Sequence, residues 1–265
     1  MEYWFSGCFA GLLALLAACA APELPPVPQY DPTALAATRY KVVLVAGDPS
    51  IKAFDNATRR LERMLAARAG VSREDLHRLS ARDDELKDKT VLLATVQGVL
   101  ATIEDLKPGR GQGCLVFATS HGVRGQGLRL PRGFGDHFID PADLDRALAL
   151  GCGNAPTVVI MSGCFSGIYA APPMARDNRI VLTAAAFDRT SFGCSAGADY
   201  TYFDACLLGS LDELGVGMTW LDAMTATKQC VAAREATLGY VPSNPQSWFG
   251  QAVTGMPLPW RREGS

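Results

Sequence analysis

Blocks of β-branched and apolar residues alternate with blocks of helical periodicity along the chain from Tyr40 onward. The apolar blocks predict buried strands at 40–47, 114–121, 157–164 and 179–184, with a weaker strand at 75–79. Helical spacing predicts a helix over 51–69 that ends at Gly70, and a second helix that is capped by Thr90 and runs to Pro108. A third helix is predicted to begin at Asp140. A later helix that packs in the core should contain Leu221, Met224, Thr225 and Lys228. Alternating strands and helices indicate an α/β fold whose mainly parallel sheet is covered on both faces.

Two of the predicted strands end in reactive side chains, His121 and Cys164. Open α/β sheets commonly build their sites from the ends of neighbouring parallel strands. The pattern therefore predicts a cysteine nucleophile, Cys164, paired with a histidine base, His121. His137 competes as the base, because it follows the glycine-rich segment 122–135, where we expect a short hairpin around residues 128–130. We prefer His121, since a strand end fixes a side chain better than a loop does.

The order of these two residues along the chain excludes several cysteine chemistries. No histidine follows Cys164, whereas α/β-hydrolases and papain-like enzymes place the histidine after the nucleophile. The cysteines are scattered without close paired spacing, which disfavours a zinc site. We therefore predict neither a metal nor an organic cofactor.

A histidine first and a cysteine second, each ending an apolar strand, resembles the caspase-like clan of cysteine peptidases. The similarity is closest to the legumain-like (C13) family, especially its bacterial lipoprotein members. It is carried by residues 43–48, 120–122, 164–167 and 183–194, with 202–204 after them.

The resemblance implies a caspase-like three-layer α/β/α sandwich and an endopeptidase that acts on peptides or proteins. It implies that the backbone amides of Gly122 and Cys164 stabilise the oxyanion. Asp188, Ser191 and Asp204 match the region that shapes the substrate pocket in this family.

The chain also departs from the family pattern. Ser162 stands where legumain has an acidic residue, and no pocket arginine can be placed near Phe54, so cleavage after asparagine is not implied. Asp48 stands near the position of the asparagine that orients the histidine, and its carboxylate can take that role.

The N-terminal segment predicts export. Residues 9–18 are apolar but too short to span a bilayer, and the tetrapeptide that ends at Cys19 resembles a bacterial lipobox. We expect a signal peptide over 1–18, a lipidated Cys19 with a proline-rich tether over 19–38, and a catalytic domain over 39–265. Ala20 after the cysteine favours the outer membrane, facing the periplasm. The leader lacks Lys and Arg, so an ordinary cleaved secretory leader remains the alternative.

Net charge limits the possible partners, and cysteine content limits the possible disulfides. The formal net charge of −2 provides no basic field for nucleic acid, which we exclude as a partner. After Cys8, Cys19 and Cys164 are set aside, five cysteines remain, at 114, 152, 194, 206 and 230. They permit at most two disulfides and one free thiol, whose pairing the spacing leaves open.

Three functions follow from these features. The first is a cysteine endopeptidase tethered to the bacterial envelope through an N-terminal lipid. The second is a transpeptidase with the same dyad, because an amine can release the acyl-enzyme as water does. The third is a noncatalytic envelope lipoprotein that keeps the fold as a binding scaffold. The sequence makes no prediction of oligomeric state.

Overall fold

A seven-stranded sheet forms the centre of the protein, seen in a computed structural model that describes residues 1, 29–36, 38–134, 137–195 and 197–261. The strand order is β10-β9-β8-β4-β1-β2-β3, and only the edge strand β10 runs antiparallel to its neighbour. The strands are β1 (Arg39–Ala46), β2 (Leu76–Ser80), β3 (Val91–Leu93), β4 (Gln112–Thr119), β8 (Thr157–Ser162), β9 (Arg179–Thr183) and β10 (Ser247–Phe249).

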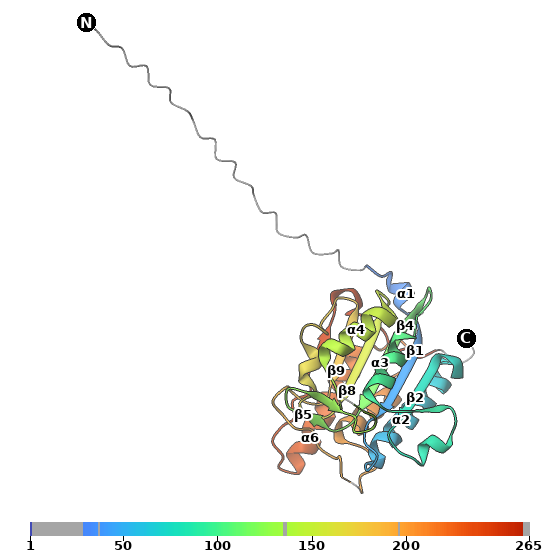
Figure 1. Cartoon of the computed structure of the whole chain (residues 1–265), viewed down its shortest axis with the longest axis vertical. Coiled ribbons are helices and arrows are strands. Elements are labelled where there is room, and N and C mark those ends of the chain that lie inside the picture. The colour runs from blue at the N-terminus through green and yellow to red at the C-terminus, as the bar shows by residue number, and fades with distance from the viewer. Residues whose placement is uncertain (2–28, 37, 135–136, 196, 262–265) are drawn as a thin grey trace.

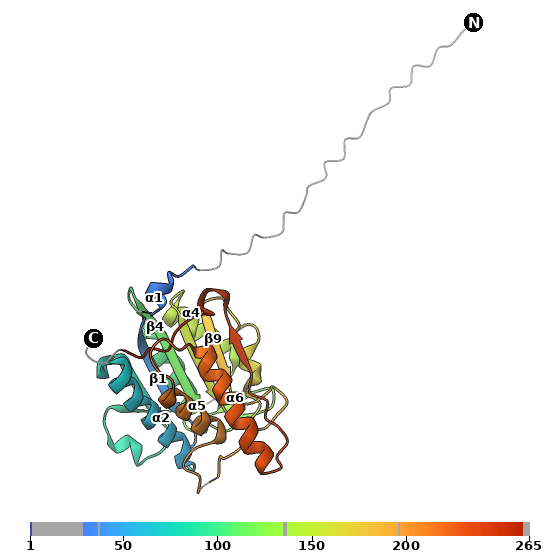
Figure 2. The ribbon, with the colours of Figure 1, turned by 180° about the vertical axis from the view of Figure 1, so that it is seen from behind.

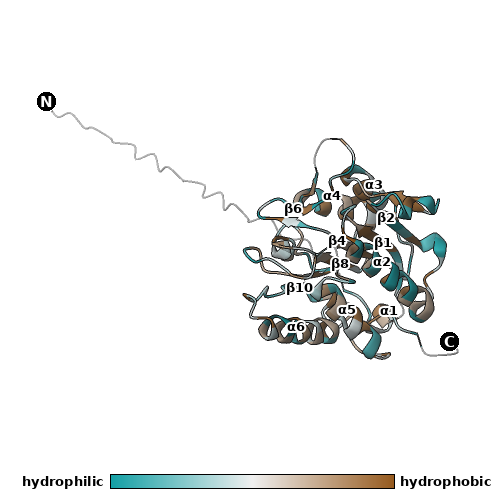
Figure 3. Cartoon of the chain, turned by 90° about the horizontal axis from the view of Figure 1, so that it is seen from below, coloured by the Kyte–Doolittle hydropathy of each residue, from teal (hydrophilic) through white to brown (hydrophobic). Residues whose placement is uncertain are grey.

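Helices cover both faces of this sheet (Figures 1 and 2). One layer contains α3 (Val96–Glu104) and α4 (Pro141–Cys152). The other contains α2 (Lys52–Met64), α5 (Tyr202–Glu213) and α6 (Trp220–Thr237). Figure 3 shows the hydrophobic strands enclosed between these layers. The predicted three-layer α/β/α sandwich is confirmed.

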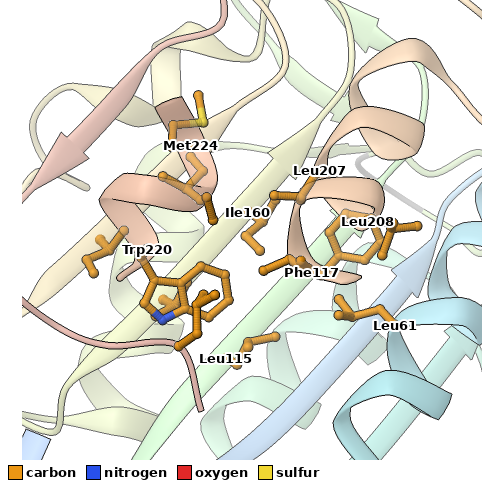
Figure 4. Close-up of a cluster of buried hydrophobic side chains, with 14 of the residues drawn as sticks. Leu61, Leu115, Phe117, Ile160, Leu207, Leu208, Trp220 and Met224 are labelled. Carbon is orange, nitrogen blue, oxygen red and sulfur yellow. The ribbon is translucent and has the colours of Figure 1, made fainter. Parts of the chain in front are cut away.

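Two hydrophobic cores lie on opposite faces of the sheet because side chains alternate along each strand. In β1, Val42 and Leu44 belong to the core under α2, α5 and α6, whereas Val43 and Val45 belong to the core under α3 and α4. Trp220 belongs to the first core, in which Leu115 of β4 and Leu207 and Leu208 of α5 also lie (Figure 4). Strands buried on both faces explain the continuous apolar runs in the sequence.

The helix predicted from Thr90 begins later than expected. Residues Val91–Leu93 pair with β2 as the edge strand β3, and Thr95 caps α3 by accepting a hydrogen bond from the Gly98 amide at 2.9 Å. The prediction was wrong because an apolar run of three residues continues a helical pattern as well as it forms a strand.

The C-terminal helices also differ from expectation. Helix α5 was not predicted, because apolar residues occupy most of its circumference and leave little periodicity. In α6, Met224 is buried as predicted, but Leu221 is 47% exposed and Thr225 faces solvent. Sequence alone could not say which side of α6 the sheet would cover.

The folded part begins before Arg39. A short helix, α1 (Pro32–Ala36), follows Tyr30, which packs against the core, and Leu35 is buried in that core. The predicted tether over 19–38 therefore belongs in part to the domain, because these apolar side chains gain by covering the sheet end. The predicted signal peptide and Cys19 lie outside the described residues. None of the helices in the described part of the chain is long and apolar enough to cross a membrane.

Among the described residues, two disulfides join neighbouring elements: one links the sheet to a helix, and the other links two helices. Cys114–Cys152 links β4 to α4, and Cys206–Cys230 links α5 to α6, while Cys164 and Cys194 are free. This pairing fits the limit of two bridges that the cysteine count sets.

We predict that these bridges form when the protein is produced in an oxidising compartment, because such compartments favour disulfides. Peptide mapping after alkylation without reductant should then find label only at Cys164 and Cys194 among the cysteines that follow residue 29. Reduction before alkylation should add label at the other four. Label at Cys206 in the unreduced, folded protein would contradict the pairing.

Candidate active site

The register of β4 and β8 brings the two predicted catalytic residues to one edge of the sheet. Thr119 pairs with Ser162, and the Ser120 amide donates to the Ser162 carbonyl at 3.0 Å. His121 and Cys164 each follow this pair by two residues. Because adjacent strands lie about 4.8 Å apart, the two residues occupy neighbouring positions just beyond the strand ends.

The turns that carry these residues are packed backbone to backbone. A Cβ on Gly122 would lie 1.8 Å from the carbonyl oxygen of Cys164, and a Cβ on Gly163 would lie 2.6 Å from that of Ser120. Only glycine permits this approach. The same positions lie 3.0 Å from the Cys164 nitrogen and 3.4 Å from the Gly122 nitrogen, respectively. The two amides predicted to form the oxyanion hole are therefore close together.

The chain turns sharply directly after Cys164. Phe165 has a left-handed backbone, with φ 57° and ψ 14°, and its amide donates to the Arg189 carbonyl at 2.7 Å. Such a conformation is costly for a bulky residue and is held only by its surroundings. A 3-10 helix follows over Ser166–Ala170, in which the Ser166 hydroxyl accepts from two amides after β9.

The thiol of Cys164 contacts Ser191. The Ser191 amide donates to the sulfur at 3.3 Å, and the thiol donates to the Ser191 carbonyl at 3.5 Å. The sulfur is therefore held between the amide and the carbonyl of one residue. Ser191, predicted as a pocket residue, thus lies against the nucleophile itself.

The ring of His121 packs against Phe54 of α2. Their centroids are 5.6 Å apart and the rings are nearly perpendicular, at 87°, which is a favourable aromatic geometry. The carboxylate of Asp48 instead accepts from the amide and hydroxyl of Ser50, at 2.8 and 2.5 Å. The expectation that Asp48 orients His121 is therefore wrong, because Asp48 is satisfied within its own turn. Nothing in the helical pattern marked Phe54 as a contact of the histidine.

Asp55, next to Phe54 on α2, makes the stability of this region depend on pH. It is buried and accepts from the Ser80 hydroxyl at 2.7 Å. Burial raises the pKa of Asp55 to about 6, and the hydrogen bond from Ser80 only partly opposes it. A raised folded-state pKa means that the protonated form stabilises the fold, so this contribution is complete below about pH 3.8 and is lost as the pH rises through about 6.

We expect Asp55→Asn to remove this dependence, since an amide does not ionise. The difference in Tm between wild type and Asp55→Asn should shift in favour of the variant as the pH rises from about 4 to about 7. Thermal unfolding followed by circular dichroism measures it. A difference that stays constant over this range would contradict the prediction.

Asp188 lies on the loop beside the nucleophile turn. Its side chain is partly exposed next to Arg189, and its carbonyl accepts from the guanidinium of Arg124 at 2.8 Å. Arg124 also lies 4.7 Å from the centre of the Phe165 ring. Arg124 therefore joins the loop after His121 to the loop after β9, a role that its sequence position did not signal.

Asp204 does not line the open site. It is fully buried on the first turn of α5 and accepts from the Thr119 hydroxyl at 2.7 Å. The prediction that Asp204 contacts substrate is therefore wrong: its carboxylate is used beneath the strand ends. A sequence motif could not show whether the Asp204 side chain points into the protein or toward the open site.

A small antiparallel sheet decides between the two histidines. It consists of β5 (Gly122–Val123), β6 (Gly127–Arg129) and β7 (Phe138–Ile139), in that order, and contains the hairpin predicted around residues 128–130. His121 adjoins β5, whose Gly122 packs against the Cys164 backbone, whereas His137 precedes β7, two strands away. The geometry favours His121 as the base.

The arrangement of these elements is similar to that of a known peptidase fold. The crystal structure of caspase-1 from Spodoptera frugiperda matches with a TM-score of 0.59 at 14% sequence identity, covering 86% of this chain and 92% of that chain. The fold is caspase-like. No curated protein matches the chain.

The sequence comparison is more specific. Residues 84–255, which include both predicted catalytic residues, match the Peptidase C13 family. The chain therefore belongs to the Peptidase C13 family and is a cysteine-type peptidase. This confirms the resemblance to the legumain-like (C13) family that its motifs indicated.

Proposed function

We propose that the protein is an endopeptidase that cleaves peptide bonds through a dyad of Cys164 and His121. The observation that carries this proposal is the register of β4 and β8, which sets both residues two positions beyond the pair Thr119 and Ser162. A nucleophile and a base within reach of each other are the minimum that thiol-based acyl transfer needs.

Acylation begins with the thiolate of Cys164 and protonated His121. The sulfur attacks the scissile carbonyl carbon, and the electron pair of the C=O bond moves to the oxygen. Collapse of this oxyanion breaks the C–N bond while His121 gives its proton to the leaving amine, which leaves a thioester on Cys164. Neutral His121 then takes a proton from water, whose oxygen attacks the thioester and releases the acid and the thiolate.

The backbone stabilises the charges in these steps. The amides of Gly122 and Cys164 are the donors proposed for the oxyanion, and each such donor lowers the barrier by on the order of 3 kcal/mol. The Ser191 amide, which donates to the sulfur at 3.3 Å, orients Cys164 at the start of the cycle. Phe54 fixes the ring plane of His121 without competing for its protons.

We also propose that the enzyme is held at the bacterial outer membrane, facing the periplasm. Support comes from the lipobox-like tetrapeptide that ends at Cys19 and from the disulfides at 114–152 and 206–230, which are typical of exported proteins. Metabolic labelling with a fatty-acid analogue should modify the wild type and not Cys19→Ala. Equal labelling of both would contradict the anchor.

Cleavage of a peptide library by the wild type, Cys164→Ala and His121→Ala tests the catalytic proposal. Turnover should be lost in Cys164→Ala and fall by about 100- to 10,000-fold in His121→Ala. Retained turnover in both variants would overturn the dyad. If an amine added to the reaction becomes joined to the cleaved peptide, the enzyme catalyses transpeptidation instead of hydrolysis.

The reactivity of the two free thiols tests the scaffold alternative. Burial raises the pKa of Cys194, and the nearby charge of Cys164 raises it further, so Cys194 is an internal reference. An active enzyme should react with iodoacetamide faster at Cys164 than at Cys194. No selective labelling at Cys164 would favour a noncatalytic scaffold.

A further inference from the structure

The carboxylate of Asp204 is buried without a cation, directly below the ends of the two strands that carry the dyad. It has no exposed surface and no ion-pair partner among the described residues. Burial raises the pKa of Asp204, and the nearby hydroxyl groups of Ser162, Thr119 and Thr201 oppose that rise. Burying a carboxyl group without a cation costs free energy, and the formation of α5 does not by itself explain why Asp204 is buried.

The two hydroxyl residues of the sheet that lie near Asp204 belong to different strands. Thr119 Oγ1 on β4 donates to Asp204 at 2.7 Å. Ser162 on β8 lies beside the same carboxyl group, and Ser162 Oγ and Asp204 Oδ1 are both buried without a regular hydrogen-bond partner among the described residues. Thr119 and Ser162 are paired across the ladder, so the carboxyl group is bonded to one strand end and lies at the level of the paired residue on the other.

This level is one step below the reactive residues. His121 and Cys164 follow Thr119 and Ser162 by two residues, the period at which side chains return to one face of a strand. Asp204 reaches that face from α5, which covers it. A change in its contacts would therefore alter the spacing of the strand ends immediately beneath the dyad.

A comparison with α6 shows that helix capping does not explain why the Asp204 side chain points toward β4. In α6, Thr219 caps the helix and Asp222 turns back to accept from the Thr219 amide at 2.8 Å, which completes a capping box. In α5, Thr201 caps the helix by accepting from the Asp204 amide at 3.0 Å, but the Asp204 side chain bonds to Thr119 instead of its own helix. The same helix position is thus used differently in α5.

We propose that Asp204 is a positioning residue that joins the ends of β4 and β8 beneath Cys164 and His121 and so fixes the distance between them. The proposal rests on the dyad described under Proposed function. Asp204 touches neither substrate nor reacting atoms, so it acts on the rate of acyl transfer and not on substrate affinity.

Kinetics of Asp204→Ala, Asp204→Asn and Asp222→Ala on a cleaved peptide test this role. Asp204→Ala should lower kcat about 100-fold, the cost of a displacement near 1 Å, with KM within about threefold. Asp204→Asn keeps an oxygen that accepts from Thr119, so its kcat should return to within about tenfold of the wild type. Asp222→Ala removes the matched carboxylate of α6 and should leave kcat unchanged.

Wild-type kcat in a folded Asp204→Ala protein would overturn the proposal, as would an equal loss of kcat in Asp222→Ala. If Asp204→Ala does not fold, Thr119→Val takes its place, because it removes the strand contact and leaves α5 intact. The same fall in kcat is then expected, and unchanged kcat again overturns the role.

Alkylation separates this proposal from the peptidase activity. If the wild type cleaves no peptide, the rate of iodoacetamide labelling at Cys164 is measured against pH. Slower labelling in Asp204→Ala below about pH 7, where a paired thiolate still reacts, would support the positioning role and count only against the proposed function. Identical pH profiles for the two proteins would overturn the positioning role.

Discussion

Gly122→Ala is expected to lower kcat/KM by about 100-fold or more, the effect of shifting reacting groups by about 1 Å. The added Cβ would lie 1.8 Å from the carbonyl oxygen of Cys164, a separation that atoms do not tolerate. The turn after His121 or the turn at Cys164 must therefore move. Either movement disturbs the dyad and the two amides proposed for the oxyanion hole.

Gly209→Ala is the matched control. Gly209 lies on α5, where an added Cβ meets nothing within 4 Å, so alanine should keep full activity and stabilise the helix by up to about 1 kcal/mol. Peptide hydrolysis by both variants, after circular dichroism has shown that they fold, makes the comparison. Wild-type activity in Gly122→Ala would show that the catalytic turns are not packed as described.

Asp145→Ala is expected to destabilise the protein by about 3–5 kcal/mol, the usual cost of leaving a buried charge without its partner. Asp145 on α4 accepts from Arg179 at 2.6 Å and from Arg176 at 2.5 and 2.7 Å. Arg179, at the start of β9, is only 2% exposed. Without Asp145, this guanidinium would stay charged in the core, because arginine does not deprotonate readily.

Asp143→Ala on the same helix is the control. Its partner Arg146 is largely exposed, and exposed pairs contribute at most about 1 kcal/mol. Urea denaturation should therefore separate the two variants clearly. Equal losses of unfolding free energy would show that the network of Asp145 is no stronger than a surface pair.

The network of Asp145 also has a defined pH dependence. Burial would raise the pKa of Asp145, but hydrogen bonds from Arg176 and Arg179 outweigh it and lower the pKa below its ordinary value of 3.8. A lowered folded-state pKa contributes stability that is present above the unfolded value and is lost as the pH falls through the folded value. This dependence is opposite in sign to that of Asp55.

The strands could be predicted from sequence, and the two residues proposed for the dyad could be singled out, because their signals are local. An apolar run that ends in His121, and another that ends in Cys164, each occupy less than a dozen residues. Parallel strands place their carboxyl ends at one edge, so topology alone predicted that the two residues would lie at the same edge of the sheet. The chain order of histidine and cysteine then selected the class of enzyme.

Features that depend on which side of an element is covered could not be predicted in this way. Asp204 matched a pocket motif, yet α5 turns it toward β4 and away from the open site. Asp48 matched the position of a histidine partner, yet Ser50 satisfies it within one turn. In both cases, a contact of a few ångströms decided a role that residue type left open.

The sequence by itself determined the alternation of strands and helices, the chain order of the two residues proposed as base and nucleophile, and the limit of two disulfides among the remaining cysteines. The tertiary structure decided which cysteines pair, that Ser191 reaches the sulfur of Cys164, and that Phe54 holds the ring of His121. The first group depends on neighbours along the chain. The second depends on residues that are distant in sequence and meet only when the sheet assembles and its helices pack on it.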